Sequence, residues 1–214
     1  QLFSQKNSVD GGDLPLHSFI RQCTDGRPQW KPDTRFSDMV SLVLDLDPSA
    51  AQTTCARNDT TLHLLSAVRA CTVAQKIDKS LFSRVLNSYP EACLHKDDHD
   101  CLPLHRAVNC RDLEPDADIV EILCHAQAKA AQYKRLPLHF ALDHEAGHIS
   151  LGVIQPIVEA YPQGCGEADG KNLAIHVAIS SRCDLDVIKC ICLAHKKALS
   201  HEVDGAVPLV HAAM

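Results

Sequence analysis

The chain has 214 residues, 45% of them hydrophobic, and a net charge of −6. Its longest basic run is Lys196-Lys197, so a nucleic-acid partner is not expected. No apolar run approaches the roughly 18 residues of a membrane-spanning helix.

A short block of the form Leu-Pro-Leu-His recurs along the chain and predicts the start of a helix each time. Proline suits the first helical position because its missing N–H has no intrahelical partner there. Thr61 and Ala174 replace the proline in two blocks, and Val210 replaces the histidine in the last. The six blocks begin at Leu14, Thr60, Leu102, Leu136, Leu173 and Val207. We interpret the five histidines as structural residues that bond to backbone: His17, His63, His105, His139 and His176.

A second block follows each of the first five and predicts a second helix. It contains two apolar pairs one turn apart, and a small residue 11 positions after the first apolar residue. Such spacing gives a wide buried stripe, as expected of a helix between two neighbours. These blocks run from Met39 to Ala50, Leu81 to Ala92, Ile119 to Ala130, Val153 to Gly164 and Val187 to Ala198. Turn residues able to adopt positive φ precede the first helices and predict projecting fingers, at Asn58-Asp59, Asp98-His99-Asp100 and Asp169-Gly170 among others.

Two blocks in fixed order define a stacked repeat. The pattern resembles ankyrin repeats of the Leu-Pro-Leu-His variety over nearly the whole chain. The resemblance implies an all-α ankyrin-repeat solenoid of helix-turn-helix units with finger loops. We expect a single array over 1–214, with repeats at 9–52, 53–94, 95–131, 132–166 and 167–200 and a partial repeat at 201–214. An insert at 24–34 separates the first two helices, and the extra residues 68–78 are expected to lengthen the first helix of the second repeat.

The resemblance implies a non-catalytic protein–protein interaction or assembly scaffold, without cofactor or metal, within a larger complex or a longer polypeptide. By analogy with the family, partner contacts are expected at the finger tips and the exposed side of each first helix. Trp30, the single tryptophan, makes the insert a further candidate. The partner-binding residues expected by position are Asp13, Arg21, Trp30, Arg57, Asp59, Asp98, His99, Asn109, Tyr133, Arg135, Asp143, Asn172 and Ser180.

Two alternatives belong to other functional classes. His144-Glu145-Ala146-Gly147-His148 matches the H-E-x-x-H motif of zinc-dependent hydrolases, in which a continuous helix presents two histidines to the metal. The repeat register instead places Gly147 and His148 in a turn between helices. The chain could also be the regulatory or docking part of a longer enzyme. A possible zinc-ligand group in one finger, Cys93, His95, His99 and Cys101, lacks the usual spacing.

Eleven cysteines are distributed along the chain, several at apolar repeat positions. Cys124, Cys190 and Cys192 are examples, which favours buried, reduced thiols over a disulfide framework. We therefore expect an intracellular, reducing compartment, the cytoplasm first, with an organelle left open. We also expect a partner, or a continuation of the polypeptide, to cover the C-terminal face around Val187, Ile191 and Leu209.

Overall fold

A computed structural model describes residues 13–24, 35–67, 78–109, 114–126, 128–132, 136–143, 149–170 and 172–200. The described chain is mainly α-helical, as the sequence predicts, with a single two-stranded hairpin in that part. None of the helices described is long and apolar enough to cross a membrane. The chain divides into two compact units, residues 1–107 and 108–214.

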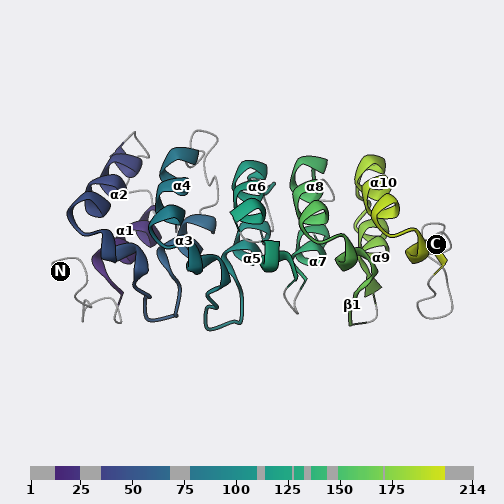
Figure 1. The fold of residues 1–214 in the computed structure, drawn as a ribbon, viewed down its shortest axis with the longest axis horizontal. Helices are drawn as coiled ribbons and strands as arrows, with labels where there is room; N and C mark the ends of the chain where they lie inside the picture. Colours follow the sequence, from purple (N-terminus) through teal and green to yellow (C-terminus); the bar gives the residue numbers. More distant parts are fainter. Residues whose placement is uncertain are drawn as a thin grey trace. The chain divides into compact units, whose positions relative to one another are not determined.

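The first unit consists of short helices that alternate with longer ones (Figure 1). Helix α3 packs against α1 and α4, and α4 also packs against α2. Helix α5 begins in this unit and ends at the first residue of the next. Its elements are α1 (Pro15–Thr24), α2 (Arg35–Leu46), the 3-10 helix η1 (Pro48–Gln52), α3 (Thr61–Ser66), α4 (Lys79–Ser88), η2 (Pro90–Leu94) and α5 (Pro103–Val108).

The second unit repeats the same order of elements. Helix α8 packs between α6 and α10, and α9 contacts both α7 and α10. The hairpin is antiparallel, with Ala168 opposite Leu173 and Asp169 opposite Asn172. Its elements are α6 (Ala117–Ala126), η3 (Ala128–Gln132), α7 (Pro137–Leu142), α8 (Leu151–Ala160), η4 (Pro162–Gly166), β1 (Ala168–Asp169), β2 (Asn172–Leu173), α9 (Ala174–Ser180), α10 (Leu185–Ala194) and η5 (Lys196–Ser200).

The predicted starts of the first helices are confirmed at five blocks. Helices α1, α5 and α7 begin at a proline, whereas α3 begins at Thr61 and α9 at Ala174. The sixth block lies outside the described residues. Helix α3 ends at Ser66, and residues 68–77, which are expected to lengthen it, lie outside the described residues.

The second blocks form the longer helices, and their apolar pairs are buried to different extents. Helices α4, α6 and α8 bury both residues of both pairs. Helix α2 buries Val40 and Leu44 but exposes Met39, and α10 buries Val187 and Ile191 fully. Val187 and Ile191 themselves are thus covered by the chain, and the covering of the surrounding C-terminal face by a partner or by a continuation of the polypeptide stays a prediction. Leu209 lies outside the described residues.

The small residue of each second block occupies the third position of a 3-10 helix. At Gly164 a Cβ would lie 2.9 Å from Cδ1 of Tyr161, so the turn leaves little room for a side chain. The predicted left-handed turns are confirmed in the fingers, where φ is 57° at Asn58, 58° at Asp100 and 66° at Gly170. Arg182 adopts the same conformation, with φ of 55°, which the sequence did not indicate.

Candidate functional site: a polar network at the finger bases

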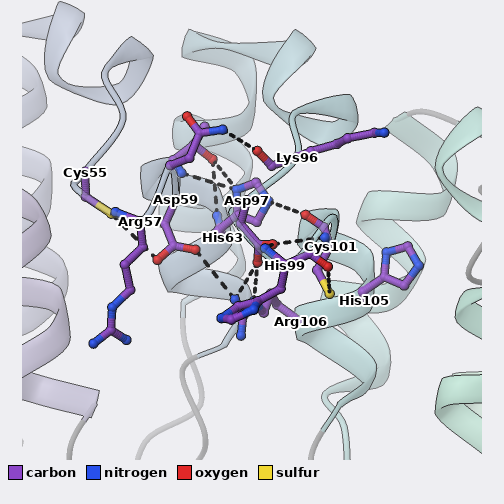
Figure 2. Close-up of polar contacts among 12 residues, drawn as sticks. Cys55, Arg57, Asp59, His63, Lys96, Asp97, His99, Cys101, His105 and Arg106 are labelled. Carbon is purple, nitrogen blue, oxygen red and sulfur yellow. Dashed lines mark hydrogen bonds and ion pairs between the residues drawn. The ribbon is translucent and has the colours of Figure 1, made fainter.

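Five charged side chains form a network in the first unit, which we call the arginine–carboxylate network: Asp13, Arg21, Asp59, Asp97 and Arg106. Nη2 of Arg21, on α1, donates to Oδ2 of Asp59 at 2.6 Å, and its Nε lies 3.2 Å from Oδ2 of Asp13. Nη2 of Arg106, on α5, lies 2.5 Å from Asp97 and 3.9 Å from Asp59 (Figure 2). The two arginines therefore share Asp59 and link α1 and α5 to the finger segments.

Asp97 is the best-bonded carboxylate of the network. Its side chain is 0% exposed, and Oδ1 accepts the N–H groups of His99 and Cys101 at 2.8 and 2.9 Å. Nε of Arg106 donates to Oδ2 at 2.7 Å. Burial alone would raise the pKa of Asp97, but the hydrogen bonds from Cys101, His99 and Arg106 hold it below the ordinary value. The carboxylate thus closes the finger turn in its charged form.

Cys55 stands at the corresponding place in the preceding finger. Its Sγ accepts the backbone N–H of Arg57 at 3.4 Å and lies 3.0 Å from Nη2 of Arg21. Burial raises the pKa of Cys55, and the charge of Asp59 adds to the rise. Burial also raises the pKa of Asp59 against the opposing effect of Arg21 and Arg106. The thiol is therefore held protonated and is a poor nucleophile.

His63 bonds to backbone on both sides. Its Nδ1 accepts the N–H of Thr60 at 3.2 Å, and its Nε2 lies 3.1 Å from the carbonyl oxygen of Cys101 in the next finger. Oγ1 of Thr60 accepts the N–H of His63 in return, which completes a capping box at the start of α3. Burial lowers the pKa of His63 to about 4, so the ring is neutral and donates through Nε2.

The other block histidines are also buried, as predicted. His105 accepts the N–H of Leu102 through Nδ1 at 3.1 Å, and Nε2 of His139 lies 3.1 Å from the carbonyl oxygen of Asn172. Burial lowers the pKa of His17 to about 4 and that of His139 below its ordinary value. His176 is likewise buried. The bonds of His63, His105 and His139 to backbone support the structural interpretation.

The structure divides the expected partner-binding residues into three groups, apart from Arg21, which is half-buried within the network. Asp13 and Asp59 were expected at exposed positions, but both are buried because Arg21 binds them inside the network. Trp30, Tyr133 and Arg135 lie outside the described residues. The exposed group comprises Arg57, Asp98, His99, Asn109, Asp143, Asn172 and Ser180. In Figure 2 the side chain of Arg57 points away from the network.

Metal and nucleophile chemistry finds little support among the described residues. In that part of the chain no three His, Cys, Asp or Glu side chains come together as metal ligands, and this holds for Cys93, His95, His99 and Cys101. His144, Glu145 and His148 lie outside the described residues.

Free thiols among the described residues include Cys55, Cys93, Cys165, Cys183, Cys190 and Cys192. Cys124 is buried, as expected, while Cys190 and Cys192 are only half-buried. Burial raises the pKa of Cys93 to about 11 and that of Cys165 to about 12. These two thiols are therefore protonated near neutral pH.

Arg106 and Asp97 are the network members that the sequence did not indicate, and it did not indicate their neighbour Cys55 either. Arg21 stands four residues after the block histidine and Arg106 one residue after it, so no common position marks them. Comparison of the sequence with protein-family models and with curated proteins gave no match.

Proposed function

We propose that the chain is a non-catalytic protein-interaction module built from ankyrin-like repeats and that its exposed finger residues contact the partner. Five first helices begin at equivalent residues, and five second helices end in equivalent 3-10 helices. The histidine bonds from one finger to the next, such as that of His63 to Cys101, support the stacking of successive units.

The observation that carries the proposal is the contrast between the base and the tip of one finger. At the base, the carboxylate oxygens of Asp97 accept hydrogen bonds from the backbone of its own turn and from Arg106. At the tip, Asp98, His99 and Asp100 are exposed and lie next to Lys96. A rigid base that presents charged, solvated side chains is suited to recognising a protein surface by shape and charge.

Adjacent fingers are also bonded to each other near their tips. The side-chain amide of Asn58 donates to the carbonyl oxygen of Lys96 at 2.7 Å. The backbone N–H of Asp98 donates to the carbonyl oxygen of Arg57 at 3.2 Å. These bonds hold Arg57 and Asp98 in a fixed relation before any partner binds. Such preorganisation reduces the entropy lost on binding.

Affinity capture with quantitative mass spectrometry tests the proposal. The finger variant combines Arg57→Ala, Asp98→Ala and His99→Ala. A matched control places two alanines at exposed residues on the α4 side, Asn87→Ala and Glu91→Ala. We expect the wild type and the control variant to capture a protein that the finger variant does not capture. All three forms of the chain should have equal melting temperatures. Equal capture by the finger variant would contradict the proposed surface.

A further inference from the structure

Large exposed apolar side chains gather on two helices of the described chain. On α2 they are Met39, Leu42 and Leu46, of which Leu42 is 53% exposed. They are spaced three and four residues apart and so lie on one side of the helix. We call this the α2 face, and half-buried Val43 extends it.

The corresponding set on α10 consists of Leu185 and Leu193, and Leu193 is 74% exposed. Ile188 and Cys192, the outer members of the two apolar pairs, are half-buried beside them. We call these four residues the α10 face. The two faces are complementary halves, because the first residues of the apolar pairs are the more accessible ones on α2 and the second residues are the more accessible ones on α10.

Within the chain, such halves meet in a fixed register. Asp45 lies six residues after the first residue of its block, and it forms an ion pair with Arg84, which lies three residues into the next block. In the second unit the same two positions are Glu159 and Cys190. The helices that carry them, α8 and α10, pack against each other. The ion pair of Asp45 and Arg84 thus sets the register, in which position six of one second helix meets position three of the following one.

The same register can be applied to α10 followed by the α2 of another molecule. Position six of α10 is Leu193, and position three of α2 is Leu42. At the positions where α2 and α4 hold the ion pair of Asp45 and Arg84, α10 and the α2 of another molecule would bring together two exposed leucines. In this arrangement Ile188 would lie near Met39.

We propose that the α10 face of one molecule binds the α2 face of a second copy of this chain, giving head-to-tail association. The contact joins two different surfaces, so each bound molecule still offers one free face and the assembly can grow. The proposal rests on the helix packing and not on the finger surface proposed above.

Sedimentation velocity of the full chain over a wide concentration range tests the proposal. We expect the weight-average mass to rise past that of a dimer with concentration, because the contact does not close. Leu42→Glu and Leu193→Glu each place a charge in one face and leave the other intact. Each variant alone is expected to stay monomeric, whereas their mixture should form a one-to-one dimer and nothing larger.

The matched control is Leu94→Glu, since Leu94 is an exposed leucine of η2 outside both faces. It should assemble like the wild type. A wild-type chain that stays monomeric at every concentration would overturn the proposal, as would undiminished assembly of both face variants. Circular dichroism melting shows that the variants fold. Partner capture by the fingers is measured separately, so failure of either proposal leaves the other tested on its own.

Discussion

Replacing His63 by alanine should destabilise the first unit, and the loss should depend on pH. The ring is 1% exposed and bonds to the N–H of Thr60 and to the carbonyl oxygen of Cys101. His63→Ala leaves both backbone groups without this partner and opens a small cavity. We expect a loss of about 2 to 4 kcal/mol in the free energy of unfolding at pH 8.

The pH dependence follows from the depressed pKa. His63 has a pKa of about 4 in the folded chain, against the ordinary histidine value of 6.5 in the unfolded chain, so the unfolded chain binds more protons between these limits. The contribution of the neutral ring is therefore complete above pH 6.5 and is lost as the pH falls toward 4. For these two values, the linkage relation gives a wild-type loss of about 2 kcal/mol at pH 5. The variant has no such ring and does not lose this stability at pH 5. The difference in unfolding free energy between wild type and variant should therefore be smaller at pH 5 by about the same amount.

Urea unfolding of wild type and variant at pH 8 and at pH 5 measures both quantities. The exposed His99 supplies the control, since His99→Ala removes a histidine from the same unit without removing a buried ring. A deficit for His63→Ala that stays the same at both pH values would refute the reasoning that burial keeps this ring neutral. A deficit below about 0.5 kcal/mol at pH 8 would refute the structural role of its two hydrogen bonds.

Three further predictions concern other parts of the chain. Asp97→Ala should cost about 3 to 5 kcal/mol in urea unfolding, because it leaves Arg106 and two N–H groups without their carboxylate, and Asp97→Asn should cost less. Arg182→Gly should raise the unfolding free energy by about 0.5 to 1 kcal/mol, since φ is 55° there, and an unchanged midpoint would contradict this. Glu145→Gln should change nothing, and metal analysis should find no stoichiometric zinc; one zinc per chain with hydrolysis lost in the variant would favour the enzyme alternative.

Much of the local structure could be predicted from sequence, because it depends on short-range chemistry. A proline without an N–H suits the first residue of a helix, which places the starts of α1, α5 and α7. Asn58 and Gly170 tolerate positive φ, which places the finger turns. Arg182 was missed because arginine has no intrinsic preference for that conformation. There it is imposed by the bonds that end α9, from Cys183 to Ala178 and from Arg182 to Ile179.

Exposure of the charged residues could not be predicted in the same way. Asp13 and Asp59 precede their helices at equivalent places, where the pattern suggests solvent-exposed finger residues. Both are buried because the long side chain of Arg21 reaches back across the base of the finger to bind them. Long-range pairing of this kind depends on which helix faces which loop. The periodicity of the sequence does not indicate which helix and loop face each other.

Cys55 and Asp97 show how one finger backbone accommodates two different polar centres. Each accepts the N–H of the residue two positions later, Arg57 for the thiol at 3.4 Å and His99 for the carboxylate at 2.8 Å. Asp97 also supplies the charge that its arginine requires, whereas a protonated thiol supplies none to Arg21. That charge comes from Asp59 at 2.6 Å and from Asp13 at 3.2 Å. Two aspartates outside the turn therefore do for Arg21 what Asp97, inside the turn, does for Arg106.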